Sequence, residues 1–206
     1  GEAPTHVILQ AGVGSMAAAC LSYFVELARS ATGASTATHA VVPKVLIVEP
    51  RNAACMHASA ERKDGAAAVV DGDLETMIAG LACGVPSDLA WPVLKEHVTG
   101  GFCWIDDVLA FNGMRRLAEA GVEAGECGGA AVGLLERLMA VDCALAAEVR
   151  RRTGLGPSSR VLVINTEGAT DPENYAKQCS LPHVPPVVGD FGFAPPMAEA
   201  PRAFMP

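Results

Sequence analysis

The feature that most constrains this chain is a strand, a glycine turn, a helix and a second strand near its N-terminus. Residues 6–10, HVILQ, form a short apolar run typical of a buried strand, and residues 11–15, AGVGS, form a turn. Residues 16–30 place apolar side chains at helical spacing, and residues 44–49, KVLIVE, predict a second buried strand. A strand–helix–strand unit brings its two strands parallel in one sheet. The sequence therefore predicts an α/β fold, a mostly parallel sheet with flanking helices.

The glycine turn after the first strand has the form of a phosphate-binding loop. Gly12 and Gly14 let the backbone approach a ligand, the helix behind them offers free amides and a positive dipole end, and Ser15 adds a hydroxyl donor. Two other interpretations stay open: a tight turn without a ligand, and the dinucleotide fingerprint G-x-G-x-x-A over residues 12–17. The dinucleotide interpretation assigns Glu49 to a ribose, but Glu49 lies 37 residues after Gly12, where about 20 are expected.

Further along the chain, the spacing of apolar residues predicts four more helices and a third strand. The helices are expected over residues 74–82 (capped by Asp73), 88–98 (beginning near Ala90), 105–120 and 129–152, and the strand over 160–165. Residues 31–43 are small and polar, so a loop is expected there. The stretch from Cys179 holds seven of the fourteen prolines, which predicts a loosely ordered tail. We therefore expect one α/β unit over residues 1–178 and a proline-rich tail over 179–206.

Charge and cysteine content exclude several classes of function. The net charge is −8, from 15 Lys and Arg against 23 Asp and Glu, which argues against nucleic acid or an anionic membrane as a partner. No apolar run approaches the ~20 residues that span a bilayer, and no signal peptide is visible, so the expected location is the cytoplasm. The seven cysteines include no C-x-x-C pair, which predicts reduced thiols and no metal site.

Motifs distributed along most of residues 5–177 resemble one family of enzymes, the diaminopropionate ammonia-lyases. In order, these motifs are HVILQAGVGSMA (6–17), VLIVEP (45–50), GDLETMIAGLACGVPS (72–87), GMRRL (113–117), AGECGGA (124–130) and NTEGATDPENY (165–175). The resemblance implies a fold-type-II pyridoxal-phosphate (PLP) enzyme, similar to the β subunit of tryptophan synthase, with the cofactor between two α/β domains. The diaminopropionate ammonia-lyases split 2,3-diaminopropionate into pyruvate and ammonia. They remove the α-proton and then the β-amino group, while the cofactor accepts the electrons.

The resemblance also implies which residues would hold the cofactor. Thr166, at the end of the third strand, is expected to meet the pyridine nitrogen, with Thr170 as the second choice; a plain turn hydroxyl is the alternative for Thr166. Gly125 and Glu126 would line the edge of the cofactor, unless Glu126 only caps a helix or faces solvent. The phosphate would be bound by the backbone amides of Gly12, Val13, Gly14, Ser15 and Met16.

Two cysteines stand where the resemblance suggests a pair. Cys55 and Cys83 are 28 residues apart and form a disulfide if the fold brings them within reach; two reduced thiols are the alternative. The sequence departs from the family pattern at Cys127 and Asn165, where serines are expected, and at Ala169, where an aspartate is expected. The loss of a carboxylate at position 169 would alter contacts to the cofactor ring or the substrate.

The lysine that holds the cofactor covalently in this family belongs to a part that precedes this chain, as does an aspartate expected to help move the substrate proton. The lysines that are present stand in other sequence contexts: Lys44, Lys63, Lys95 and Lys177. No catalytic residue is therefore expected here. The resemblance implies the C-terminal half of a PLP-dependent ammonia-lyase, acting on an amino acid, inactive without its N-terminal half and homodimeric when complete. The alternative is a non-catalytic remnant or a phosphate-binding module.

Overall fold

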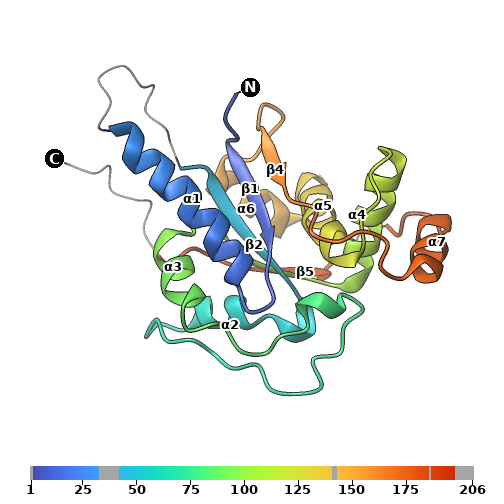
Figure 1. The fold of residues 1–206 in the computed structure, drawn as a ribbon, viewed down its shortest axis with the longest axis horizontal. Coiled ribbons are helices and arrows are strands. Elements are labelled where there is room, and N and C mark those ends of the chain that lie inside the picture. The colour runs from blue at the N-terminus through green and yellow to red at the C-terminus, as the bar shows by residue number, and fades with distance from the viewer. Residues whose placement is uncertain (1, 33–41, 141–142, 186, 198–206) are drawn as a thin grey trace.

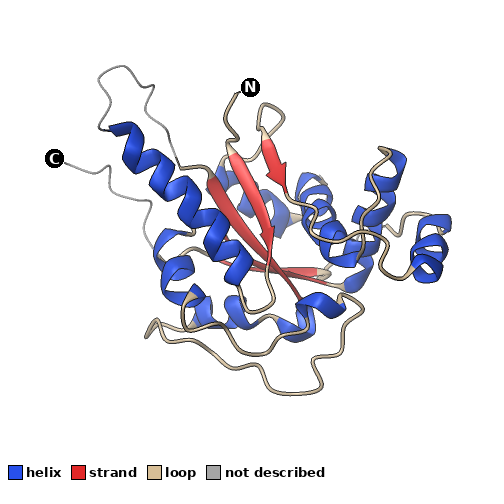
Figure 2. Ribbon diagram, viewed as in Figure 1, coloured by secondary structure: helices blue, strands red, loops and turns tan. Residues whose placement is uncertain are grey.

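The computed structural model describes residues 2–32, 42–140, 143–185 and 187–197, which form a sheet with helices on both faces (Figure 1). Figure 2 separates the helices from the strands by colour. The strands are β1 (His6–Gln10), β2 (Lys44–Pro50), β3 (Gly101–Ile105), β4 (Val161–Val163) and β5 (Phe191–Ala194). The helices are α1 (Ser15–Thr32), α2 (Cys55–Glu61), α3 (Ala90–His97), α4 (Asp107–Glu119), α5 (Glu126–Met139), α6 (Ala144–Thr153) and α7 (Pro172–Ser180), with 3-10 turns η1 (Arg51–Ala53) and η2 (Ala79–Leu81).

The described strands lie in the order β4–β1–β2–β3–β5. β1 pairs in parallel with both β2 and β4, β2 pairs in parallel with β3, and β5 runs antiparallel along β3. The predicted α/β fold with a mostly parallel sheet is confirmed. Since parallel strands end at the same edge of a sheet, the glycine turn after β1 and Thr166 after β4 lie on the same side of the molecule.

Each face of the sheet carries its own apolar core, because successive side chains of a strand point to opposite faces. Ile8 and Leu46 are fully buried among residues of α4, α5 and α6. Leu9 and Ile47, one residue further along each strand, are fully buried among residues of α1, α2 and α3. In Figure 1, α1 lies to one side of β1 and α5 lies to the other. Burial on both faces explains why β1 and β2 are continuous apolar runs.

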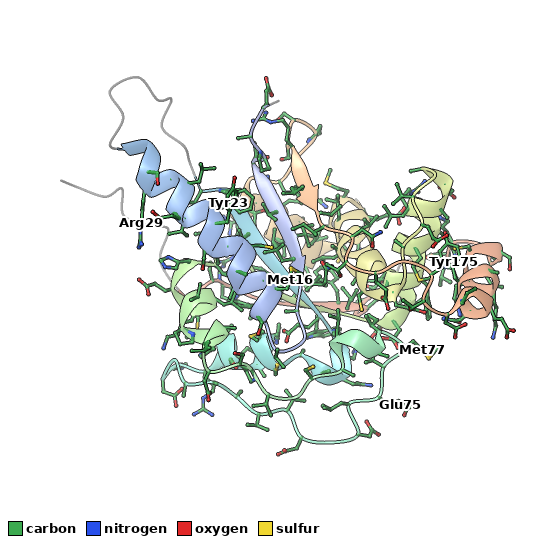
Figure 3. All side chains as sticks on the ribbon, in the orientation of Figure 1. Met16, Tyr23, Arg29, Glu75, Met77 and Tyr175 are labelled. Carbon is green, nitrogen blue, oxygen red and sulfur yellow. The ribbon has the colours of Figure 1, made fainter. Side chains whose placement is uncertain are left out.

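The longest described helix, α1, is amphipathic. Ala17 and Leu21 are buried against the sheet, whereas Tyr23 and Leu27 are exposed. Tyr23 is labelled on α1 in Figure 3. No helix within the described ranges combines the length and the apolar character needed to cross a bilayer. The helix starts at Ser15 and runs to Thr32, while residues 33–41 of the loop expected at 31–43 lie outside the described residues.

Several elements differ from the sequence prediction. The strands at 6–10, 44–49 and 160–165 are present, the last reduced to the three residues of β4. The helices expected at 88–98 and 105–120 are present as α3 and α4. The sequence analysis does not predict β3, β5, α2 or α7. β3 begins at the second of two consecutive glycines, and its described partner strands are distant in sequence, so no local periodicity indicates it.

The prediction of a helix at residues 74–82 is wrong, since the only helical element there is the 3-10 turn η2. This segment is held in an irregular path by the Asp107 carboxylate, which accepts hydrogen bonds from the Thr76 hydroxyl at 2.5 Å and the Met77 amide at 2.6 Å. Asp73 does not cap a helix there; its Oδ1 accepts from the amide of Glu75 at 3.0 Å. Tertiary contacts thus replace the helical hydrogen bonds that the local sequence favours.

The prediction of a single helix at residues 129–152 is also wrong, because α5 ends at Met139 and α6 begins at Ala144. Arg150 of α6 donates to the carbonyl oxygens of Leu138 and Ala140, at 2.9 Å for Ala140. These carbonyls lie at the C-terminus of α5, where a helix leaves acceptors unused. The arginine therefore stabilises the chain reversal between the two helices.

Part of the proline-rich segment 179–206 packs on the sheet and on α5. β5 is the fifth described strand of the sheet and pairs with β3, and the Asp190 side chain is buried in an ion pair with Arg137 of α5. Prolines prevent a helix in this segment, but they do not prevent one short edge strand. Residues 198–206 lie outside the described residues.

Candidate functional site

A cleft of about 540 Å³ opens at the carboxyl edge of the sheet, where the loop after β1 faces the segment after β4. Three parts of the chain form its walls: the glycine turn with the start of α1, the irregular segment around η2, and the stretch after β4. The lining residues are Gln10, Ala11, Gly12, Val13, Gly14, Ser15, Met16, Gly80, Leu81, Cys83, Cys127, Thr166, Glu167, Gly168 and Thr170.

The glycine turn has a backbone path that only small residues permit. Gly14 has φ +87°, in the left-handed region, and a Cβ there would lie 2.4 Å from Met56 Cε and 2.9 Å from Leu94 Cδ1. The turn is fixed at both ends, since the Ala11 amide donates to the Val48 carbonyl at 2.9 Å and Val13 O accepts from the Ser87 amide at 2.9 Å. The loop is therefore held in one shape by the surrounding structure.

The start of α1 supplies hydrogen-bond donors to the cleft. The amides of the first turn of a helix have no partner within that helix, and they carry the positive end of its dipole. The Ala18 amide donates back to Gly14 O at 2.9 Å, so the amides before it are the ones left over. Met16, at the start of α1, lies beside the end of β1 in Figure 3. Such an arrangement suits an anion.

Thr166 and Thr170 lie on the opposite wall. The Thr166 hydroxyl oxygen accepts a hydrogen bond from Gln10 Nε2 at 2.8 Å. The Thr170 hydroxyl donates to Glu167 Oε1 at 3.3 Å, and Glu167 Oε2 accepts from the Cys127 amide at 2.8 Å, which caps the N-terminus of α5. Because Thr170 is engaged by this carboxylate, Thr166 is the threonine better placed to serve a ligand.

The Cys127 thiol, which also lines the cleft, is unreactive in this setting. Burial, with the Glu167 carboxylate as the next cause, raises the pKa of the Cys127 thiol to about 12. A thiol with such a pKa stays protonated at neutral pH and is a poor nucleophile. The described residues contain no cluster of three or more His, Cys, Asp or Glu side chains suited to a metal ion.

Gly125 and Glu126 are not among the residues that line the cleft. The Gly125 amide donates to Glu167 O at 2.9 Å, and Glu126 Oε1 accepts from Asn174 of α7 at 2.5 Å. A Cβ at Gly129, in the same motif, would lie 2.4 Å from the Ala110 carbonyl of α4. Gly129 therefore serves the close packing of α4 and α5, whereas a Cβ at Gly125 would meet the Glu167 side chain. A sequence motif alone does not distinguish such packing from a ligand site.

Cys55 and Cys83 lie on either side of the glycine turn as free thiols. The Cys55 thiol donates to Gly12 O at 3.7 Å, and the Cβ position of Gly12 is 3.0 Å from Cys83 Sγ. Burial raises the pKa of the Cys55 thiol far above its usual range, with the neighbouring Glu49 as the next cause. Their pairing in a disulfide stays a prediction.

Glu49 does not take the role that the dinucleotide interpretation gives it. Its side chain is fully buried and absent from the residues that line the cleft. Both carboxyl oxygens accept backbone amides at the start of α2, from Met56 and from His57, each at 2.8 Å. Because the side chain is fully buried outside the cleft, it does not reach a ribose there, and Glu49 instead caps α2.

Buried Glu49 predicts a pH dependence of stability. Burial raises its pKa from 4.5 to about 8, against the opposing effect of the two amide hydrogen bonds. The folded state therefore holds this proton more tightly than the unfolded state, so the stabilisation present at low pH is lost as pH rises towards 8. Between pH ~7 and ~8, ionisation of Glu49 should lower the free energy of unfolding by about 1 kcal/mol.

Urea denaturation at several pH values tests this dependence, with Glu49→Gln as the matched variant. The glutamine cannot ionise, so its free energy of unfolding should stay level over the same window, whatever its absolute value. An equal slope in both proteins would mean that Glu49 is not the group responsible.

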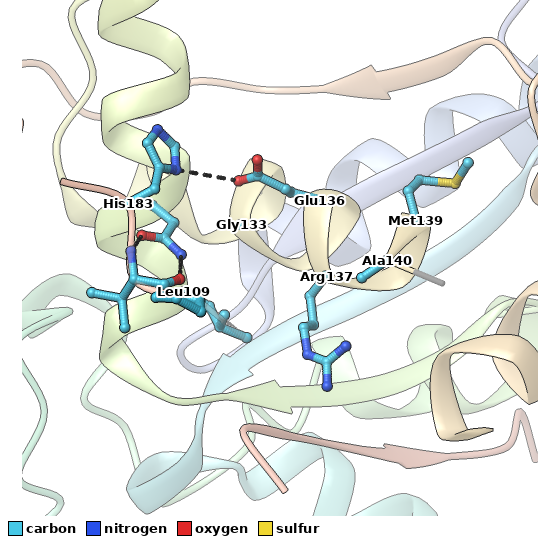
Figure 4. Close-up of a pocket in the computed structure, with 10 residues that line it drawn as sticks. Leu109, Gly133, Glu136, Arg137, Met139, Ala140 and His183 are labelled. Carbon is cyan, nitrogen blue, oxygen red and sulfur yellow. Dashed lines mark hydrogen bonds and ion pairs between the residues drawn. The ribbon is translucent and has the colours of Figure 1, made fainter. Parts of the chain in front are cut away.

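A second cavity, of about 490 Å³, lies between α4, α5 and residues 183–185 (Figure 4). His183 points at Glu136, with 3.9 Å between Nδ1 and Oε2, and its Nε2 lies 3.3 Å from Glu119. Asn112 holds the same segment by accepting from the Val184 amide at 3.0 Å and donating to its carbonyl at 2.9 Å. None of the predicted site residues lines this cavity, and its polar groups attach the proline-rich segment to α4 and α5.

The structure thus brings part of the predicted site together and adds residues that were not predicted. Residues 12–16, Thr166 and Thr170 share one cleft, whereas Gly125 and Glu126 lie beside it. The sequence analysis does not identify the other polar and thiol residues of the lining: Gln10, Cys83, Cys127 and Glu167. For Gln10 a signal exists, since it is the one polar residue after three apolar ones, directly before the glycine turn.

The curated proteins that this chain resembles share one name. The chain is 40% identical over 178 residues to the diaminopropionate ammonia-lyase of Salmonella typhimurium, covering 84% of this chain and 41% of that protein. It is 35% identical over 180 residues to the Escherichia coli enzyme of the same name, covering 85% of this chain and 42% of that protein. The chain therefore spans about two fifths of the length of these curated relatives.

Solved structures agree with the fold. The holo diaminopropionate ammonia lyase from Escherichia coli superposes with a TM-score of 0.71 at 32% identity, over 87% of this chain and 42% of that one. The same enzyme in complex with an aminoacrylate–PLP azomethine reaction intermediate gives a TM-score of 0.70, also at 32% identity, over 87% and 43% of the two chains. A threonine deaminase isoform from Solanum lycopersicum, at 15% identity and a TM-score of 0.63 over 86% and 45%, shares the fold alone.

A profile of the family described as "Pyridoxal-phosphate dependent enzyme" matches residues 1–167. This match includes the glycine turn and Thr166, which face each other across the cleft. The chain belongs to the family of pyridoxal-phosphate-dependent enzymes.

Proposed function

We propose that this chain provides the phosphate-binding side of a PLP-dependent ammonia-lyase that eliminates ammonia from 2,3-diaminopropionate and yields pyruvate. The observation that carries the proposal is the cleft itself, where a rigid glycine turn and a helix N-terminus face a threonine hydroxyl across the carboxyl edge of the sheet. The relatives named as diaminopropionate ammonia-lyases support the choice of substrate.

The residues of the cleft fit a PLP molecule on chemical grounds. At Gly12 an added Cβ would crowd Cys83, and at Gly14 it would clash with Met56 and Leu94, so glycines are needed for the shape in which this turn borders the cleft. Gln10 Oε1 is buried and has no hydrogen-bond partner among the described residues, so the cleft holds an acceptor that a bound group or water can satisfy. The cleft thus offers donors at one end and a hydroxyl with an acceptor at the other.

Each part of the cleft has a distinct role in this proposal. Amides of residues 12–16 bind the phosphate, and the Thr166 hydroxyl bonds to the pyridine nitrogen. When bound, PLP supplies an electron sink for the carbanion left by proton removal. Thr170 and Glu167 hold the wall behind Thr166 in place, since Glu167 links the Thr170 hydroxyl to the N-terminus of α5.

The proposal requires further residues for catalysis. No lysine is among the cleft residues of the described chain, and the Lys95 amine donates to Gly65 O at 3.3 Å. We propose that the covalent lysine and the base come from the remaining part of the enzyme, and that the whole protein is a cytoplasmic homodimer. The chain alone should then bind PLP without turning over diaminopropionate.

Calorimetry with PLP and with pyridoxal, which lacks the phosphate, tests this function. PLP should bind, and pyridoxal should bind about tenfold more weakly or worse, because a phosphate at a helix N-terminus contributes up to ~2 kcal/mol. NAD is the control ligand for the dinucleotide interpretation and should give no heat. Equal affinity for PLP and pyridoxal, or tight binding of NAD alone, would contradict the proposal.

A further inference from the structure

Gln10 has an orientation that the hydrogen bonds around it determine. It ends β1, is 2% exposed, and its Nε2 lies 2.8 Å from both the Ile164 carbonyl oxygen and the Thr166 hydroxyl oxygen. A carbonyl oxygen only accepts hydrogen bonds, so the side-chain atom beside it must be the amide nitrogen. The side-chain amide of Gln10 therefore turns its donor end, and not its oxygen, towards Thr166.

This orientation leaves the Thr166 hydroxyl with one free hydrogen. The two hydrogens on Gln10 Nε2 are used by the Ile164 carbonyl and by Thr166 Oγ1. Thr166 Oγ1 accepts in that bond, so its own hydrogen must be donated elsewhere. No described residue accepts it, and Thr166 is an exposed residue that lines the cleft. Thr166 thus offers a hydroxyl donor to the cleft.

We propose that Gln10 is a positioning residue that sets the polarity of the Thr166 hydroxyl, so that the cleft selects a ring nitrogen without a proton. This rests on the proposed function, in which Thr166 meets the pyridine nitrogen of PLP. A neutral pyridine nitrogen accepts the Thr166 hydrogen through its lone pair. A pyridinium N–H would take the remaining lone pair of the hydroxyl oxygen and would leave the Thr166 hydrogen without an acceptor among the described residues, because Gln10 presents only its N–H there.

The ¹⁵N chemical shift of ¹⁵N-labelled PLP bound to the full chain reports the protonation state directly. In the unmodified chain, the resonance should stay at the neutral-pyridine position throughout the pH range in which the chain is folded. Gln10→Glu keeps the shape but offers only acceptors when ionised, so the Thr166 hydrogen turns towards residue 10 and its oxygen towards the ring. The resonance should then shift towards the pyridinium position, and Thr166→Ser, which keeps the hydroxyl, should behave as the unmodified chain.

A second variant keeps the proposal testable if the buried carboxylate of Gln10→Glu prevents folding. Thr166→Val removes the hydroxyl at similar shape, so the bound ring nitrogen should titrate as it does in free PLP. If the unmodified chain gives a pyridinium shift, or if a folded Gln10→Glu or Thr166→Val variant keeps the neutral shift, the role of Gln10 is overturned. The proposed function then still stands. The absence of any bound resonance at saturating PLP overturns the proposed function together with this inference.

Discussion

Asp190→Ala is expected to reduce the free energy of unfolding by about 3–5 kcal/mol, because it leaves a buried cation without its partner. Arg137 Nε lies 2.7 Å and 2.9 Å from the two carboxyl oxygens of Asp190, and the side chains are 4% and 1% exposed. Asp190 also accepts from the Val187 amide at 2.9 Å. The substitution therefore removes a charge partner for α5 and a fixed point for the segment that leads into β5.

The loss can be measured by urea denaturation against Asp64→Ala, the same substitution in an exposed ion pair with Arg62 at 2.5 Å. Exposed pairs contribute little, so this control should differ little from the unmodified chain. Replacing both members, as Arg137→Met with Asp190→Leu, should recover much of the lost stability, since no charge is then left buried. Equal stability of Asp190→Ala and Asp64→Ala would mean that the proline-rich segment is not packed on α5.

This ion pair also shows where prediction from sequence ends. Asp190 lies 53 residues from Arg137, within a segment whose prolines indicate a loose tail, and nothing near Asp190 in the sequence marks it as buried. The same holds for β3 and β5, whose pairing partners are distant in sequence. By contrast, β1, the glycine turn and α1 follow one another directly, so apolar spacing and turn residues suffice to predict them.

Some residues of the cleft can likewise be predicted from the sequence, and others cannot. The donors of the glycine turn are a local property of strand, turn and helix, and the sequence predicts them. Thr166 is predicted through the family resemblance, because its position opposite the turn depends on β4 pairing with β1. The contact of Gln10 with Thr166 spans 156 residues and needs the three-dimensional structure. In the motif at residues 124–130, Gly129 serves the packing of α5 against α4, and the role of Gly125 and Glu126 at the edge of a cofactor stays a prediction.

Gly14→Ala is expected to combine a loss of stability with a loss of PLP binding. An L-residue at φ +87° costs about 1–2 kcal/mol, and crowding by Met56 and Leu94 adds about 1–3 kcal/mol. Relief of the crowding requires the turn to move, which shifts the amides of residues 12–16 away from the phosphate position. We therefore expect PLP affinity to fall about tenfold or more by calorimetry.

Gly154→Ala separates these effects, because Gly154 has φ +74° at the end of α6 and its Cβ would meet nothing within 4 Å. This control carries the left-handed strain without the crowding, and it lies outside the residues that line the cleft. It should lose about 1–2 kcal/mol of stability and bind PLP as the unmodified chain does. If Gly14→Ala also kept full affinity for PLP while losing only as much stability as Gly154→Ala, the turn would not be the phosphate site, and the anion would have to be bound elsewhere in the chain.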